Sequence, residues 1–188
     1  MSDEYINILT PEGILTSKKV LKSEAHRLGL WHASVHVWIT NTKGEVLLQK
    51  RASNKDTFPN LWDVSVAGHL TFGDTPLKAA LREVQEEIGI TLDASCLEHI
   101  MSVRSIKNPT PLITDREFHH IYIAVWKDAI PSIADFTLQQ EEVAALRWIS
   151  ITALKQELKK KTIDFVPHEK DYLEAVLTQL DTLIPINL

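Results

Sequence analysis

The sequence is short of several residue types, and each shortage excludes a class of protein. Cys96 is the one cysteine, so the chain can form neither an internal disulfide nor a cysteine-rich zinc site. No apolar run approaches the roughly 20 residues that a membrane-spanning helix needs. Residues 1–4 are acidic and lack the basic start of a secretory signal. We therefore expect a cytoplasmic protein without a membrane partner.

An excess of positive charge is also missing. Lys and Arg total 20 against 25 Asp and Glu, which gives a net charge of −5. Sequence-independent nucleic-acid binding needs clustered positive charge, so we expect no nucleic-acid partner. The acidic balance suits a pocket that collects divalent cations. The 188 residues, 44% of them apolar, are enough for one domain with a sizeable core.

Apolar periodicity and turn residues predict a mixed order of elements. Strands are expected over 4–9, 35–40, 45–51, 62–67, 97–105, 117–126 and 145–149, with a helical turn over 23–28 and helices over 152–160 and 168–183. Residues 41–44 form the turn of a predicted hairpin. Strands, helix, strands and helices in this order predict an α/β (α+β) sandwich with a mixed sheet, not a doubly wound parallel sheet.

The clearest helix follows Thr75. Thr75 is a good N-cap, Pro76 occupies the first helical position, and Gly89 follows the last turn. An apolar stripe at helical spacing is formed by Leu77, Ala80, Leu81, Val84 and Ile88. This stripe predicts that the helix packs on a core.

Three carboxylates share another face of this helix. Glu83, Glu86 and Glu87 stand at i, i+3 and i+4, and such like-charge pairs repel by about 0.2–0.5 kcal/mol on an exposed helix. Arg82, four residues before Glu86, compensates in part. Mg²⁺ or Mn²⁺ would compensate further, because hard cations prefer carboxylate oxygen. Taken alone, such glutamates more often form a solvated acidic face.

The wider pattern over residues 68–90 resembles the signature of the Nudix superfamily. The matching residues, all correctly spaced, are Gly68, Arg82, Glu83, Val84, Glu86, Glu87, Gly89 and Ile90. Average residue frequencies make a chance match on the order of one in a million. Asp74 departs from the signature, which has Glu there, and it is expected either to cap the turn or to lie beside the metal.

The resemblance implies a fold and an activity. The fold is a Nudix-type α/β/α sandwich with a mixed β-sheet, with residues 1–188 as a single domain, about 30–150 as its core and 151–188 as C-terminal helices. The activity is metal-dependent hydrolysis of a phosphoanhydride bond in a small-molecule diphosphate, such as a nucleoside diphosphate linked to another moiety. The cofactor is Mg²⁺ or Mn²⁺.

The resemblance also assigns roles to the signature residues. Glu83 and Glu87 become metal ligands, Glu86 a further ligand or a base for water, and Arg82 the residue that orients these carboxylates. The physical logic is independent of the family. An acidic site repels a diphosphate, whereas a bound cation inverts the field and lowers the pKa of a bound water. Catalysis is then in-line attack at phosphorus.

Residues 23–73 resemble a second group, the type I isopentenyl-diphosphate isomerases and their hydrolase-like relatives. The resemblance is carried by Ala25-His26, His32, Lys50-Arg51-Ala52 and the run over 62–69. In those isomerases, histidines matching His26, His32 and His69 hold a metal with acids of a later strand. Asp115 and Glu117 are the candidates for those acids. The histidines could hold a second metal or contact the diphosphate, and both readings stay open.

One residue argues against the isomerase reaction. The isomerases use a thiol just before the Gly-His pair, and Ala67 stands there. The Arg-Glu-any-any-Glu-Glu segment, which isomerases tend to lose, is intact. We therefore predict a hydrolase, with an isomerase or a catalytically silent binding module on a Nudix scaffold as alternatives.

Residues outside the signature are expected to bind the substrate. Arg51 and Lys55 flank the loop after the hairpin and are candidate diphosphate contacts with Gly68 and His69, although two exposed cations would look the same. Specificity is expected to reside in the loops 52–60 and 105–115.

The remaining histidines are expected to lie in strands. Adjacent His119 and His120 point to opposite faces of a strand, so at most one faces the site, and His36 is expected to pack in its strand. Glu141 and Glu142 are minor candidates for the general base. The protein is expected to be a monomer or a homodimer.

Overall fold

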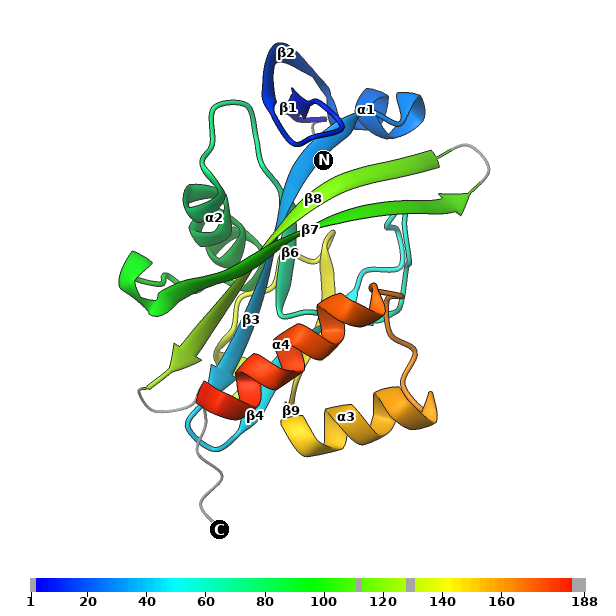
Figure 1. The fold of residues 1–188 in the computed structure, drawn as a ribbon. Helices are drawn as coiled ribbons and strands as arrows, with labels where there is room; N and C mark the ends of the chain where they lie inside the picture. Colours follow the sequence, from blue (N-terminus) through cyan, green and yellow to red (C-terminus); the bar gives the residue numbers. More distant parts are fainter. Residues whose placement is uncertain (1–2, 111–112, 128–130, 184–188) are drawn as a thin grey trace.

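A mixed seven-stranded sheet forms the centre of the molecule (Figure 1). The structure, a computed structural model, describes residues 3–110, 113–127 and 131–183. The strand order is β5-β4-β3-β8-β7, with β6 paired to β3 and β9 to β4. The bounds are β3 Trp31–Asn41, β4 Glu45–Arg51, β5 Trp62–Asp63, β6 Val66–His69, β7 Leu97–Thr110, β8 Ile113–Trp126 and β9 Val143–Ser150. The pairing of β3 with β8 is parallel and the other pairings of this sheet are antiparallel, so the sheet is mixed, as predicted.

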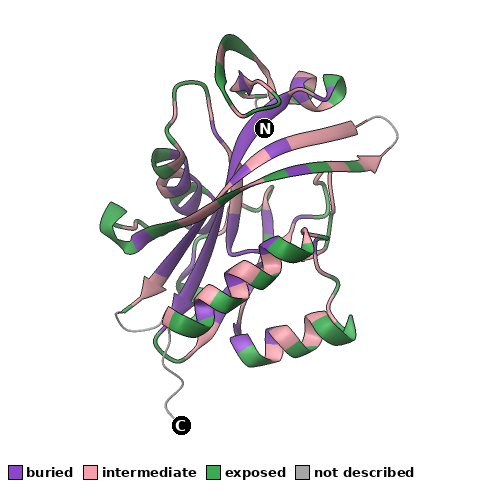
Figure 2. Ribbon diagram, in the orientation of Figure 1, coloured by how far each residue is buried: buried purple, intermediate pink, exposed green. Residues whose placement is uncertain are grey.

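Helices cover both faces of the sheet. The helix α2 (Pro76–Ile88) packs on one face, and α3 (Ile151–Lys160) and α4 (Lys170–Leu183) pack on the other. All eleven residues of β3 are buried, and Figure 2 shows this buried strand running through the centre of the molecule. Val35 and Val37 pack with α2, whereas Trp38 packs with α4. Successive residues of a strand point to opposite faces, so β3 contributes to both cores of the α/β/α sandwich.

The helix α2 has the ends that the sequence predicts. The Thr75 hydroxyl accepts a hydrogen bond from the Lys78 amide, Pro76 begins the helix, and Gly89 ends it with φ 74°. The predicted apolar stripe is wrong at Leu77, which is exposed. Glu83 and Glu87 are buried instead. The inward face of α2 is therefore partly acidic, which excludes the solvated acidic face for these two residues.

A second sheet lies at the N-terminal end. β1 (Tyr5–Leu9) pairs with β2 (Leu15–Leu21), and α1 (Lys22–Leu28) follows directly. The strand β2 was not predicted, because most of its residues are exposed and polar and lack a clear alternation. The Phe72 amide donates to the Tyr5 carbonyl at 2.8 Å, which ties this hairpin to the loop before α2.

Several predicted boundaries need correction. The strand expected over 62–67 is two short strands, β5 and β6, separated at Ser65, whose hydroxyl bonds the Leu47 carbonyl. The expected loop 105–115 is largely strand, since β7 extends to Thr110 and β8 begins at Ile113, and residues 111–112 lie outside the described residues. The irregular segment 52–60 is confirmed. Within the described ranges, no helix has the length and apolar character of a membrane span.

Candidate active site

A cavity of about 370 Å³ brings together residues that are far apart in the sequence. Its lining includes side chains of α1, β3, β4, β6, α2 and β8, with segment 52–60 and the residues before α4. A volume of this order is typical of small-molecule sites. Of the residues predicted to bind substrate or metal, His26, Arg51, Lys55, Gly68, His69, Glu83, Glu86, Glu87 and Glu117 line this cavity.

Glu83 and Glu87 reach the cavity from α2 across the backbone of β6. They are 8% and 3% exposed, whereas the Glu86 side chain is about half exposed at the rim. A Cβ atom added at Gly68 would lie 2.0 Å from the Glu83 carboxyl carbon. Only glycine therefore leaves room for this carboxylate over the strand.

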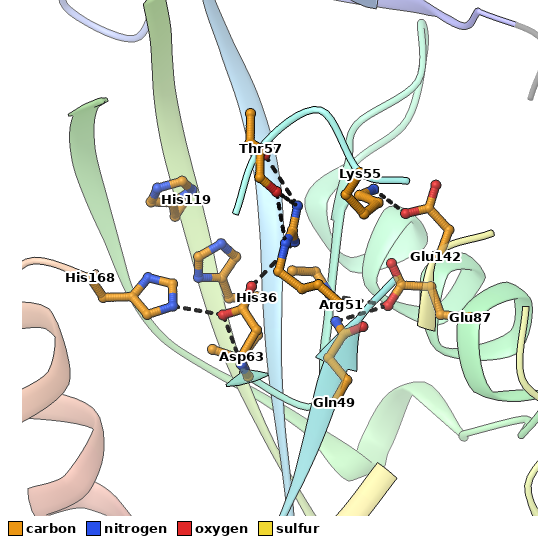
Figure 3. Close-up of polar contacts among 12 residues, drawn as sticks. His36, Gln49, Arg51, Lys55, Thr57, Asp63, Glu87, His119, Glu142 and His168 are labelled. Atoms are coloured by element: carbon orange, nitrogen blue, oxygen red, sulfur yellow. Dashed lines mark hydrogen bonds and ion pairs between the residues drawn. The ribbon is translucent and has the colours of Figure 1, made fainter. Parts of the chain in front are cut away.

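Of the two buried carboxylates, Glu83 pairs with Arg82, whereas Glu87 accepts hydrogen bonds from uncharged groups. Burial raises the pKa of Glu83 to about 7, and burial together with the charge of Glu83 raises the pKa of Glu87 well above its usual value. Oε2 of Glu87 accepts weak hydrogen bonds from Gln49 Nε2 at 3.2 Å and from the Ala67 amide at 3.4 Å (Figure 3). The pair has the charge and oxygen ligands that a divalent cation needs.

Arg82 contacts the carboxylates of Glu83 and Glu86 and holds them in place. Its Nη1 donates to Oε1 of Glu83 at 2.8 Å and to Oε2 of Glu86 at 2.9 Å, and its Nη2 donates to the His69 carbonyl at 2.9 Å. Nε of Arg82 donates to Oδ2 of Asp74 at 3.3 Å, and the Thr71 hydroxyl donates to the same oxygen at 2.6 Å. Asp74 was expected either to cap the turn or to lie beside the metal, and these contacts place it in the turn before α2.

A second group of possible ligands lies at the end of the cavity near α1. One nitrogen or oxygen of each of His26, His32, His69 and Glu117 lies within 4.8 Å of all the others. Oε1 of Glu117 is 2.9 Å from Nε2 of His69 and 3.4 Å from Nε2 of His32. Nε2 of each histidine is nevertheless buried without a hydrogen bond of acceptable geometry. Nδ1 of His32 lies 2.9 Å from the Leu30 carbonyl, which fixes the ring with Nε2 toward Glu117.

The protonation states of His26, His69 and Glu117 also fit a cation, whereas Glu117 raises the pKa of His32 although burial opposes this. Burial, with repulsion from His32, lowers the pKa of His26 to about 4, and burial lowers that of His69 to about 3 against the attraction of Glu117. The pKa of Glu117 is held well below its usual value, although burial opposes this, because His119, His32 and His69 stabilise the carboxylate. Neutral imidazoles and an ionised carboxylate are the forms that bind metals.

Asp115, the other predicted acid, stands slightly apart. Its Oδ1 is 3.7 Å from Nε2 of His32 and 3.8 Å from Nε2 of His26. Burial and the charge of Glu117 raise the pKa of Asp115 to about 7. Asp115 thus lies near the histidines, in surroundings that oppose its ionisation beside Glu117.

The two predicted cationic contacts already have protein partners. Arg51 donates to Oδ2 of Asp63 at 3.3 Å and to the Thr57 carbonyl, and Lys55 forms an ion pair with Glu142 (Figure 3). Both side chains are partly buried in the wall of the cavity, which excludes the alternative of two freely exposed cations. Glu142 lines the cavity, whereas Glu141 is exposed.

Three further histidines line the cavity and were not predicted as site residues. His36 of β3 and His119 of β8 lie on the same face of the sheet as His32, and His168 precedes α4. The signal was present, because His32, Ser34 and His36 alternate on one strand and therefore share a face. His119 faces the cavity while His120 does not line it, as the alternation predicts.

Comparison with known proteins identifies the family. The NUDIX domain matches residues 30–168. An uncharacterised Nudix hydrolase of Clostridium acetobutylicum is 34% identical over 96% of this chain and 98% of its own length. Nudix hydrolase 3 of Arabidopsis thaliana is 37% identical over 90% of this chain, which spans 22% of the length of that protein. The isopentenyl-diphosphate Delta-isomerase of Corynebacterium diphtheriae is 31% identical over 97% of this chain and 100% of its own length.

A solved structure shows the same fold. The DR0079 protein of Deinococcus radiodurans superimposes with a TM-score of 0.70 at 21% identity, and the match covers 94% of this chain and 99% of that one. The fold, the domain match and the full-length relatives agree with the signature on α2. The chain belongs to the Nudix family and is a Nudix hydrolase.

Proposed function

We propose that this protein hydrolyses a phosphoanhydride bond in a small-molecule diphosphate with the help of Mg²⁺ or Mn²⁺. The observation that supports this most strongly is the buried pair Glu83 and Glu87, which faces a cavity that also contains Arg51 and Lys55. Arg82 pairs with Glu83 but not with Glu87, so two buried carboxylates on one helix favour a divalent ion, and the nearby basic side chains favour an anionic substrate.

Different residues of the chain would bind the cation, bind the phosphates and activate the water. Glu83 and Glu87 would hold the cation, which would neutralise the diphosphate and lower the pKa of a water molecule. Arg82 fixes the carboxylate of Glu83 by its bond at 2.8 Å. Arg51 and Lys55 would exchange Asp63 and Glu142 for phosphate oxygens. Release of Lys55 would free Glu142 as a base, and Glu86 at the rim is the alternative.

We further propose that His26, His32, His69 and Glu117 hold a second cation. The three Nε2 atoms converge on the Glu117 carboxylate and none has a hydrogen-bond partner, which is the arrangement of an open ligand set. Gly68 and His69 are adjacent on β6, so the strand joins the histidine group to the carboxylates of α2. We also propose that residues 1–188 form one domain, because the β1–β2 hairpin is bonded to the loop before α2.

Isomerisation of isopentenyl diphosphate is the alternative activity, since a full-length relative carries that name. The position that would need a thiol is occupied by Ala67, which lines the cavity. Cys96 is exposed and lies among the described residues outside the cavity lining. A methyl group cannot transfer a proton, so the side chains present favour hydrolysis.

A screen of diphosphate compounds with Mg²⁺ and with Mn²⁺ tests the proposal. Released phosphate is measured after coupling to a phosphatase, and isopentenyl diphosphate is included with detection of its dimethylallyl isomer. We expect Glu87→Gln to keep the fold and to reduce kcat by roughly 100-fold or more, because it removes a charged ligand.

The matched control is Glu98→Gln, which alters an exposed carboxylate of β7 outside the cavity lining. This control should keep the activity of the wild type. Unchanged turnover in Glu87→Gln, or formation of the isomer without phosphate release by the wild type, would count against the hydrolase.

A further inference from the structure

One end of the cavity is built from imidazoles that neither candidate metal group uses. We call His36, His119 and His168 the imidazole cluster. His36 and His119 are 6% and 2% exposed, and the His168 side chain is 1% exposed. The rings of His36 and His119 stack with centroids 4.3 Å apart, and the ring of His168 meets that of His36 edge-on at 5.3 Å. All three line the cavity that holds Glu83 and Glu87.

The hydrogen bonds around Tyr172 fix the orientation of the His36 ring. Nε1 of Trp38, which can only donate, donates to the Tyr172 hydroxyl at 2.8 Å. Nδ1 of His36 lies 3.0 Å from the same hydroxyl, which can donate to this nitrogen or accept from it. The ring of His36 is therefore held with Nδ1 toward Tyr172.

His168 and His119 each keep one ring nitrogen unpaired. Nε2 of His168 lies 2.7 Å from Oδ1 of Asp63, and Nδ1 of His168 is buried without a partner among the described residues. Nδ1 of His119 lies 2.7 Å from the Ser34 hydroxyl, and its Nε2 is also buried without a partner among them. The imidazole cluster thus contains two buried ring nitrogens that no described protein group satisfies.

The imidazole cluster lies apart from the carboxylates of α2. In Figure 3 the three imidazoles lie on one side of Arg51, and Glu87, Lys55 and Glu142 lie on the other. The acids that contact the cluster are paired within the protein, since Oδ1 of Asp63 is 2.7 Å from Nε2 of His168 and Oε2 of Glu117 is 3.3 Å from Nδ1 of His119. The cavity therefore has one end with the charged groups of the proposed reaction and another end that presents ring nitrogens.

We infer that the imidazole cluster binds an uncharged, hydroxyl-bearing part of the substrate, such as a sugar ring, and selects it over a hydrocarbon tail. The inference rests on the proposed function, because it assigns the other half of the same diphosphate molecule. A hydroxyl both donates and accepts, so it can pair with a buried ring nitrogen whether that nitrogen donates or accepts. A hydrocarbon would leave buried nitrogens unpaired, and sites built for a hydroxyl reject such analogues strongly.

Kinetics with sugar-bearing and hydrocarbon-bearing diphosphates test whether the imidazole cluster selects the sugar. kcat/KM is measured for ADP-ribose, UDP-glucose and isopentenyl diphosphate on the wild type, His168→Phe and His36→Phe. His99→Phe, an exposed histidine of β7 outside the cavity lining, is the matched control. We expect the wild type to prefer at least one sugar-bearing substrate by about tenfold or more, and both cluster variants to lose most of this preference. An unchanged preference in both folded variants would overturn the inference.

A binding measurement separates the inference from the proposed activity. Ring ¹H–¹⁵N NMR signals of His36 and His168 are recorded with Mg²⁺ and with the α,β-methylene analogues of ADP and ADP-ribose, which resist hydrolysis. Methylenediphosphonate is the probe without a sugar. Shifts with a sugar-bearing analogue alone support the imidazole cluster as the subsite, even where no substrate is turned over. Shifts of the same size with methylenediphosphonate, or none with either analogue, overturn it.

Discussion

At the scale of single residues, the site depends on a close approach between Gly68 and Glu83. The Glu83 carboxylate lies over the strand, where a side chain would otherwise stand. The same approach buries Glu83 and raises its pKa to about 7 through loss of hydration. One missing Cβ atom therefore decides both where the carboxylate lies and how strongly it needs a cation.

The first prediction is that Gly68→Ala removes cation binding more than it removes stability. The new methyl group would overlap the Glu83 carboxyl group, so the side chain must leave the cavity. We expect Mn²⁺ affinity, measured by electron paramagnetic resonance, to fall by about tenfold or more.

Gly73→Ala is the comparison for this prediction. Gly73 has φ +89° and open space around its Cβ position, so the variant should lose about 1 kcal/mol of stability and keep its Mn²⁺ affinity. Equal loss of affinity in both variants would show that backbone strain, not displacement of Glu83, is the cause.

At the scale of elements, α4 matters because its Tyr172 contacts His36 of the imidazole cluster. Tyr172 is fully buried in this helix, and its hydroxyl joins Trp38 and His36 of β3. The helix was predicted over 168–183 from an apolar face of Tyr172, Val176, Leu180 and Leu183, and it begins at Lys170. The first three of these residues are buried, whereas Leu183 is half-buried. What the periodicity could not show is that the polar end of Tyr172 points at a histidine of another element.

The second prediction concerns Tyr172→Phe. It leaves the Trp38 indole N–H and Nδ1 of His36 without a partner, and an unmade buried hydrogen bond destabilises by about 1–3 kcal/mol. We expect urea denaturation to show a loss of about 2 kcal/mol, with the Mn²⁺ affinity of the carboxylates unchanged. Tyr5→Phe, at an exposed tyrosine of β1, should change the unfolding free energy little. Equal effects of the two substitutions would contradict the buried hydrogen-bond network.

At the scale of the whole molecule, one buried acid links its own strand to two other segments of the chain. Asp63 contacts Arg51 of β4, His168 before α4 and the amide of Val64. Burial opposes ionisation, yet His168 and Arg51 hold the pKa of Asp63 well below its usual value. A lowered pKa in the folded state contributes stability above the unfolded value, and this contribution is lost as the pH falls through the folded value.

The third prediction follows from the lowered pKa of Asp63 in the folded state. Asp63→Asn should destabilise the protein at pH 7 by about 3 kcal/mol, because it leaves Arg51 without its charge partner. The difference from the wild type should shrink as the pH falls below about 4, where the carboxylate becomes protonated in the unfolded chain. Urea denaturation between pH 7 and pH 3 measures it, with the exposed Asp171→Asn as control. A difference that does not vary with pH would contradict the ion-pair explanation.

The sequence alone determined the elements whose causes are local. The caps of α2 at Thr75 and Gly89, the hairpin turn at 41–44 and the mixed order of elements follow from backbone preferences of neighbouring residues. The signature over residues 68–90 was also recognisable from the sequence, since it is a local pattern in which one helix places Glu83, Glu86 and Glu87 on one face. Their burial, and the exposure of Leu77, were not predictable, because both depend on which strand lies opposite the helix.

Only the tertiary structure decided what each histidine and each cation contacts. His26, His32, His69 and Glu117 come from four elements and meet because β3 pairs in parallel with β8 and antiparallel with β6. The imidazole cluster also depends on His168, which the chain brings against His36 of β3 just before α4 begins. Pairing and docking of distant segments are cooperative and non-local, so no window of the sequence contains them.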